Sequence, residues 1–160
     1  MTGIVFAMAC VFAGCSYDVT DSPKDRGNWE VASPDGSITT SVCFDGNGKL
    51  SYSVKKGSVQ VVNSSTLGFT IEEDDFRLLT FENDSVKRVQ GSYENKSGKH
   101  REVVYDCNET TLTFKAWEFY LDVIIRVYDD GYAFRYNVRA IDGSSGTMPV
   151  LSENTEFALP

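Results

Sequence analysis

The sequence predicts an all-β domain built as an antiparallel β-sandwich, and three observations support this prediction. From Trp29 onward, apolar and polar residues alternate with a period of two over most segments, which is typical of strands with one buried face. Turn-forming Gly, Asp and Asn residues separate these segments at intervals of about eight to twelve residues, as in β-sandwiches. The chain contains 8 Tyr and 10 Phe, and aromatic residues favour strands. No segment has the sustained apolar period of about 3.6 residues that a helix needs.

The composition is that of one folded domain with an acidic surface. A chain of 160 residues with 41% hydrophobic residues is long enough to bury a core and too apolar for a disordered protein. The formal net charge of −8 argues against nucleic acid as a partner, because phosphate binding relies on Lys and Arg. A neutral sugar is compatible with such a surface, and so are many other ligands.

The N-terminal 28 residues are interpreted as a signal peptide and a tether. Residues 1–17 carry no charge, and the apolar run at 4–13 is too short to span a bilayer. Small residues precede Cys15, as in a bacterial lipoprotein signal. In this interpretation residues 1–15 form a lipoprotein-type signal region, with cleavage before Cys15. Cys15 is then lipidated, and the polar residues 16–28 form the tether. The mature protein would then be periplasmic or anchored to the outer membrane, touching the membrane only through its lipid. An ordinary secretory signal cleaved nearby is the alternative.

Four strands are predicted in the first half of the folded region. Alternating apolar and polar residues predict strands at 38–44 and 50–54, joined by an Asp-Gly-Asn-Gly turn at 45–48. This turn has a faint likeness to a calcium loop, but an EF-hand needs more ligands at fixed positions, so a plain hairpin turn is the interpretation. Two further strands are predicted at 59–62 and 67–71.

The second half predicts more strands and one further hairpin. An acidic, solvated turn is predicted at 72–75, and residues 76–81 could be a short strand or a loop. Further strands are predicted at 86–93, 101–107, 112–116, 121–127 and 132–136. The Asp-Asp-Gly turn at 129–131 joins the last two, and Gly131 is expected to adopt a positive φ.

Candidate reactive side chains are few. Cys43 and Cys107 lie outside the predicted signal; in an exported protein they could pair, and two unpaired core thiols are the alternative. No CxxC motif or Cys/His cluster occurs, so no zinc site is predicted. His100 is the only histidine, and it is interpreted as an exposed structural residue. Trp29 is predicted to join the core, whereas Trp117, in a turn-like segment, could be exposed and stack on a sugar.

Six short motifs occur in a fixed order between residues 29 and 157. The most informative one, at 126–136, reads Arg-Val-Tyr-Asp-Asp-Gly-Tyr-Ala-Phe-Arg-Tyr. The others are Trp-Glu-Val-Ala-Ser-Pro-Asp-Gly at 29–36, Gly-Lys-Leu-Ser-Tyr-Ser-Val at 48–54, Ser-Thr-Leu-Gly at 65–68, the pair Asn108 and Glu109, and Glu-Asn-Thr-Glu-Phe at 153–157. Each motif alone is weak. Together, and in this order, they resemble the N-terminal domain of glycoside hydrolase family 97.

The resemblance implies a fold, a partner domain and a metal. The fold would be a large mutarotase-like super-sandwich that packs against a catalytic (β/α)₈ barrel. Enzymes of this family cleave α-glucosides or α-galactosides, so an α-linked oligosaccharide is the implied substrate of the whole enzyme. The resemblance also implies a calcium ion at the active site, to which the sandwich lends one glutamate. Glu153 is the position matched to that ligand, and Glu156 is the alternative.

Two interpretations of the function follow. In the first, residues 29–160 are the sandwich, incomplete at its C-terminus, of an exported calcium-dependent α-glycosidase. Its catalytic carboxylates are implied to lie on the barrel, so no residue here is assigned a catalytic role, and the chain alone is expected to be inactive. In the second, the chain is a free-standing carbohydrate-binding or structural lipoprotein built on the same sandwich.

Overall fold

The computed structural model describes five stretches of the chain, namely residues 27–71, 79–96, 102–116, 119–147 and 149–160. Several sequence predictions fall outside these stretches: the signal peptide with Cys15, nearly all of the tether, the acidic turn at 72–75, His100 and Trp117. The first strand begins at Gly27, two residues before the predicted start of the sandwich at Trp29.

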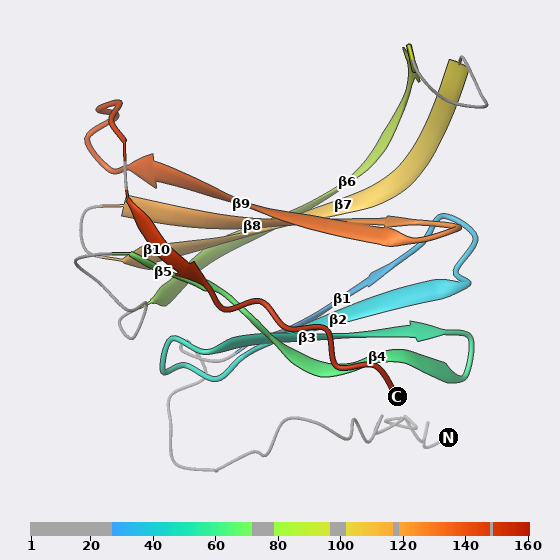
Figure 1. The fold of residues 1–160 in the computed structure, drawn as a ribbon, viewed down its shortest axis with the longest axis horizontal. Coiled ribbons are helices and arrows are strands. Elements are labelled where there is room, and N and C mark those ends of the chain that lie inside the picture. The colour runs from blue at the N-terminus through green and yellow to red at the C-terminus, as the bar shows by residue number, and fades with distance from the viewer. Residues whose placement is uncertain (1–26, 72–78, 97–101, 117–118, 148) are drawn as a thin grey trace, which may run out of the picture.

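The described residues form ten strands (Figure 1). In chain order they are β1 (Gly27–Ala32), β2 (Ile38–Phe44), β3 (Leu50–Lys56), β4 (Val59–Leu67), β5 (Phe69–Ile71), β6 (Thr80–Glu94), β7 (Glu102–Ala116), β8 (Phe119–Tyr128), β9 (Tyr132–Ala140) and β10 (Val150–Glu153). Every pairing among them is antiparallel. The predicted all-β antiparallel fold is therefore confirmed. Within the described stretches, no helix has the length and apolar character needed to cross a membrane.

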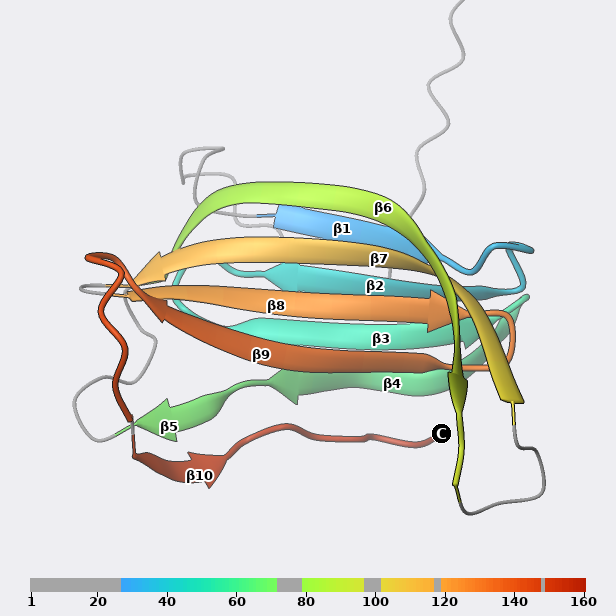
Figure 2. The same ribbon diagram turned by 90° about the horizontal axis from the view of Figure 1, so that it is seen from above.

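Two four-stranded sheets form the layers of the sandwich. One has the order β1-β2-β3-β4 and the other the order β6-β7-β8-β9, and they lie face to face (Figures 1 and 2). Consecutive strands are neighbours in each sheet, so each layer is a simple meander. A small third sheet pairs β5 with β10 at the side of the sandwich where β4 and β9 form the sheet edges (Figure 2). The C-terminal residues continue along this side.

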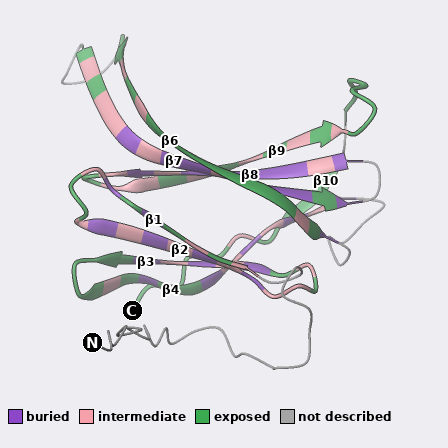
Figure 3. Ribbon diagram, turned by 180° about the vertical axis from the view of Figure 1, so that it is seen from behind, coloured by how far each residue is buried: buried purple, intermediate pink, exposed green. Residues whose placement is uncertain are grey.

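The core lies between the two large sheets and takes in the buried residues of both (Figure 3 colours the buried positions along each strand). Phe114 on β7 has no exposed surface, and its ring centroid lies 5.1 Å from that of Phe44 on β2. Trp29 is half-buried and packs against this core, with its ring centroid 4.8 Å from that of Phe81. The core position predicted for Trp29 is therefore confirmed. Burial of such rings is the main favourable contribution to folding.

Strand β7 is longer than the sequence pattern predicted. Separate strands at 101–107 and 112–116 were expected, because Asn, Glu and Thr interrupt the apolar alternation between them. Instead Glu102–Ala116 forms one continuous strand, in which the side chains of Asn108 and Glu109 have polar partners on other strands. Asn108 donates to the carbonyl of Ala32 on β1 over 2.8 Å, and Glu109 forms ion pairs on the outer face of its sheet.

The far ends of β6 and β7 project beyond the sandwich as a two-stranded ribbon (Figure 1). Pairing of β7 with β8 reaches only to Cys107, whereas its pairing with β6 continues to Glu102. Asp106 accepts hydrogen bonds from Arg88 and Gln90 across this ribbon, and these bonds lower the pKa of Asp106 to about 2. An isolated two-stranded ribbon is only marginally stable, so these cross-strand bonds help to hold it together.

Turn geometry confirms one prediction and corrects another. In the turn at 45–48, Asp45 accepts from the backbone N–H groups of Asn47 and Lys49, so its carboxylate serves a plain hairpin turn. The hairpin at 129–131 is also present, but Gly131 does not have the positive φ that was expected. The turn is instead closed by a 2.7 Å hydrogen bond from the N–H of Tyr128 to the carbonyl of Gly131, and no left-handed residue is needed at Gly131.

The two cysteines of the sandwich do not pair with each other. Cys107 on β7 is a free thiol with no exposed surface, and Cys43 lies on β2 in the opposite sheet. Of the two alternatives for Cys107, the structure therefore supports the buried core thiol.

Candidate functional site

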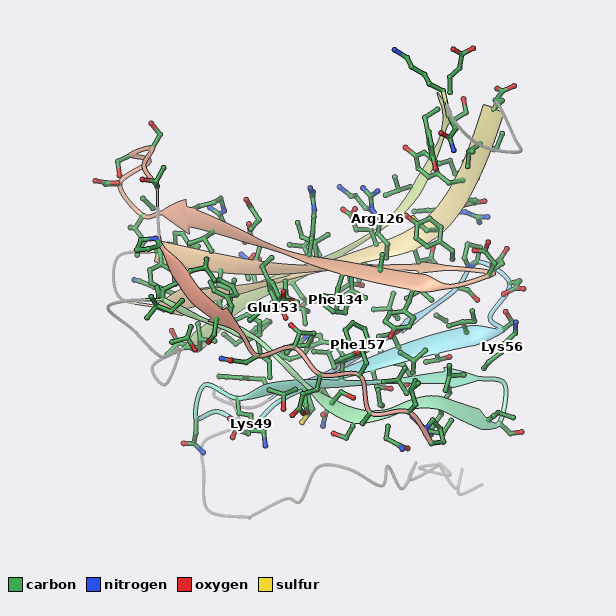
Figure 4. All side chains as sticks on the ribbon, in the orientation of Figure 1. Lys49, Lys56, Arg126, Phe134, Glu153 and Phe157 are labelled. Carbon is green, nitrogen blue, oxygen red and sulfur yellow. The ribbon has the colours of Figure 1, made fainter. Side chains whose placement is uncertain are left out.

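The candidate site lies on the C-terminal segment, defined here as residues 153–160. This segment leaves β10 and runs along the open side between the two large sheets (Figure 4). Its backbone bonds to β4 and to the residue that follows it: Asn154 N–H donates to the Gly68 carbonyl over 2.8 Å, and Glu156 N–H donates to the Thr66 carbonyl over 2.9 Å. The Asn63 N–H in turn donates to the Ala158 carbonyl over 2.8 Å. The segment thus adds strand-like pairing to the exposed edge of β4.

Aromatic contacts hold the same segment against both sheets. Phe157 stacks on Phe134 of β9 with ring centroids 6.1 Å apart and an interplanar angle of 26°. It also meets Tyr52 of β3 edge-on at 6.2 Å, and the Tyr52 hydroxyl donates to the Glu156 carbonyl over 2.9 Å. Phe157 nevertheless stays 60% exposed. The segment therefore covers the open side between the two large sheets. The side chain of Phe157 still exposes apolar surface to the solvent.

The two glutamates matched to a calcium ligand differ in their surroundings. Glu153 is exposed at the end of β10, opposite Phe69 of β5, and within the described stretches its carboxylate makes no hydrogen bond or ion pair. The Glu156 carboxylate accepts a 3.3 Å hydrogen bond from the backbone N–H of Thr66. Glu153 is thus the carboxylate that remains available to an external cation, whereas Glu156 is already engaged in fastening the segment.

The fit of these residues to calcium can be tested from their oxygen ligands. Calcium takes about six to eight oxygens, and one carboxylate supplies at most two. Among the described residues, no group of three or more Asp, Glu, His or Cys is placed to hold a metal ion. Glu153 therefore fits the role of a single contributed ligand. The remaining ligands would have to come from groups that the described residues do not include.

The sequence motif at 65–68 fastens the C-terminal segment. Ser65 is buried; its hydroxyl donates to the Asn63 carbonyl over 2.9 Å and accepts from the N–H of Ala158 over 3.0 Å. The carbonyl of Gly68, at the end of the motif, accepts from the N–H of Asn154 and from the hydroxyl of Thr155. Two motifs that lie far apart in the sequence thus form one structural unit.

The motifs at 29–36 and 126–136 also meet. The Ser33 hydroxyl donates to the Asp35 carboxylate over 2.6 Å, and Asp35 N–H donates to the Asp129 carboxylate over 2.9 Å. The bond from Ser33, followed by those from Ser37, holds the pKa of Asp35 well below its usual range. Gly36 completes this turn with a φ of 74°, a value that glycine adopts without strain. These motif residues join the first hairpin to the Asp-Asp-Gly turn.

Glu109, from the Asn108–Glu109 motif, is paired with Arg126 on the outer face of the β6–β9 sheet (Figure 4). The two side chains are joined by a 2.6 Å contact from Arg126 Nε to Glu109 Oε2, and Lys87 Nζ lies 2.9 Å from the other oxygen. The Glu109 side chain is only 5% exposed. Burial raises the pKa of Glu109, but the hydrogen bonds from Lys87 and Arg126 outweigh burial and leave the pKa lowered.

Asp122 is a second buried carboxylate on this face, and its role was not predicted from the sequence. Asp122 interrupts the apolar run of β8, and it accepts two hydrogen bonds from Arg139, each 2.9 Å long. Asn137 and Thr113 donate to it as well. The bonds from Arg139 are the main reason that the pKa of Asp122 is lowered. A charged residue inside an otherwise apolar strand was the available signal, but its partner could not be identified from the sequence.

The lowered pKa values of Asp122 and Glu109 predict a loss of stability in acid. A carboxylate whose pKa is lower in the folded state stabilises the fold above its unfolded pKa of about 4, and this contribution disappears as the pH falls through the folded value. We expect the free energy of unfolding in urea to decrease from about pH 5 to about pH 2. Asp122→Asn should reduce the slope of that decrease. Equal slopes for Asp122→Asn and the unchanged protein would contradict the prediction.

Comparison with known proteins identifies the class to which this arrangement belongs. Residues 31–160 match the family model described as Glycosyl-hydrolase 97 N-terminal. The chain therefore belongs to the family of N-terminal domains of glycoside hydrolase family 97, as the six motifs indicated.

The relatives are much longer than this chain. A probable retaining alpha-galactosidase of Streptomyces bingchenggensis is 26% identical over 99% of this chain and 25% of its own length. The structure of a beta-arabinopyranosidase is similar with a TM-score of 0.74 and 29% identity, over 82% of this chain and 21% of that one. A family 97 enzyme of Pseudoalteromonas sp. strain K8 in complex with panose has a TM-score of 0.68 and 29% identity, over 82% of this chain and 20% of that one. The chain thus spans about a quarter or less of each relative.

Proposed function

We propose that this domain serves an exported, calcium-dependent α-glycosidase by packing against its catalytic barrel and supplying Glu153 as a ligand of the calcium ion. The single observation that carries this proposal is the position of Glu153. Its carboxylate is exposed and unengaged among the described residues, while the residues that follow it are fastened to the sandwich. A calcium ion bound there would supply a fixed positive charge beside the substrate.

The relatives support an oligosaccharide as the substrate of the whole enzyme. One relative is named a probable retaining alpha-galactosidase, and the Pseudoalteromonas enzyme was solved with panose and with acarbose. We propose an α-linked glucoside or galactoside for the enzyme that carries this domain. The catalytic acid, and the base or nucleophile, are assigned to the barrel. The domain itself supplies one calcium ligand, Glu153, and covers one side of the active site on the barrel.

Replacing Glu153 in the full-length enzyme tests this proposal. We expect Glu153→Gln to raise the calcium concentration that gives half-maximal hydrolysis of an aryl α-glycoside by at least about tenfold, because the neutral amide is a weaker ligand than the carboxylate. Excess calcium should restore part of the activity. Glu156→Gln is the matched control, and its calcium requirement should stay within about twofold of the unchanged enzyme. The same calcium requirement for Glu153→Gln and the unchanged enzyme would refute the role of Glu153.

A further inference from the structure

Tyr136 connects the β9 strand to the C-terminal segment beside Glu153. Its ring is half-buried and packs against Phe69, with centroids 5.2 Å apart. Its hydroxyl lies 2.9 Å from the hydroxyl of Thr155. Burial raises the pKa of Tyr136, the bond with Thr155 offsets part of the rise, and the negative charge of Glu153 adds to it.

Thr155 links Tyr136 to the opposite side of the segment. The Thr155 hydroxyl can donate to the carbonyl of Gly68 over 3.4 Å, and either hydroxyl can be the donor in its 2.9 Å contact with Tyr136. The preceding residue, Asn154, is fixed twice: its N–H donates to the Gly68 carbonyl, and its side chain donates to the Thr70 hydroxyl over 2.8 Å. The two residues that directly follow Glu153 are thus held by β9 on one side and by residues 68–70 on the other.

We propose that Tyr136 is a positioning residue that fixes the backbone at Glu153, acting through Thr155, so that the carboxylate is held in the orientation a calcium ion requires. Glu153 stands at the end of a four-residue strand whose side chains are all exposed, and burial of its own side chain does not restrict it. Its backbone is held by the pairing with Phe69 and by the bonds of the two residues that follow it. Groups that orient metal ligands commonly change metal affinity by about 10–100-fold when they are removed.

This inference rests on the proposed function, because it assumes that Glu153 binds the ion. Tyr136 and Thr155 belong to the sequence motifs at 126–136 and 153–157, and the positioning of Glu153 gives these two residues a role. The Thr155 hydroxyl is hydrogen-bonded both to the Tyr136 hydroxyl and to the Gly68 carbonyl. Removing either hydroxyl should raise the calcium concentration that the enzyme requires. A variant that keeps a hydroxyl at position 155 should not show this increase.

The test compares variants that differ by a single hydroxyl in the full-length enzyme. We expect Tyr136→Phe and Thr155→Val each to raise the calcium concentration for half-maximal activity by about tenfold or more, with a combined effect smaller than the product of the two. Thr155→Ser keeps the hydroxyl and should stay near the unchanged value. Tyr120→Phe makes the same chemical change as Tyr136→Phe on the outer face of β8 and is the matched control.

A second readout does not depend on activity. In the calcium-free protein, Tyr136→Phe should increase amide hydrogen exchange of residues 153–158 while the exchange of β2 and β8 stays the same, because only the fastening of the segment is loosened. If Glu153→Gln raises the calcium requirement and Tyr136→Phe changes neither the requirement nor the exchange, the positioning role is wrong and the ligand role stands. If Glu153→Gln has no effect, the proposed function itself fails.

Discussion

Phe114→Ala is expected to lower the free energy of unfolding by about 3–5 kcal/mol. Phe114 has no exposed surface, and its ring contacts the rings of Phe44, Trp29 and Phe81 from both sheets. Removing it leaves a cavity between the layers that rigid sheets fill only partly. Since domains of this size are stable by about 5–15 kcal/mol, the variant should unfold at a much lower urea concentration.

The control for this prediction lies on the same strand. Val104 on β7 is 76% exposed, and Val104→Ala should change the free energy of unfolding by no more than about 0.5 kcal/mol. Urea denaturation followed by tryptophan fluorescence measures both variants. Similar losses for Phe114→Ala and Val104→Ala would show that the space between the sheets is not the core.

Arg126→Met is expected to destabilise the protein by about 1–3 kcal/mol, because it leaves the buried Glu109 carboxylate without its shorter hydrogen bond. Methionine keeps the apolar part of the arginine side chain, so most of the packing is retained. Lys87 remains as a partner, but its side chain is largely exposed and compensates only in part. Urea denaturation near neutral pH measures the loss.

Arg88→Met gives the comparison that isolates burial. Arg88 forms a similar pair with Asp106 in the projecting ribbon, where both side chains are more exposed, and exposed pairs contribute little to stability. We expect its urea midpoint to stay close to that of the unchanged protein. If Arg88→Met destabilises as much as Arg126→Met, the burial of Glu109 is not what makes its ion pair important.

The local sequence pattern was sufficient to predict the main strands and hairpins. Period-two alternation at 38–44 and 50–54 predicted β2 and β3 with nearly their observed bounds, because each strand has one face on the core. The pattern was not sufficient for β10, whose four residues are all exposed and show no alternation. It also divided β7, because the partners that stabilise Asn108 and Glu109 lie on other strands.

The motifs located the important contacts but did not reveal how they pair. Thr155 and Gly68 are 87 residues apart in the sequence, and no local rule connects them. The same holds for Asp35 and Asp129. The structure shows that these motif residues mainly join distant turns and strands. Of the two glutamates that the resemblance matches to calcium, Glu153 is the one whose side chain the contacts among the described residues leave available.

The role of Glu153 can be tested by a crystal structure of the full-length enzyme grown with calcium. We expect a calcium ion with a Glu153 carboxylate oxygen at about 2.3–2.6 Å and with its other ligands on the catalytic barrel. Tyr136 and Thr155 should keep their contact beside it. A calcium ion coordinated without Glu153, or through Glu156 in its place, would show that Glu153 is not the ligand.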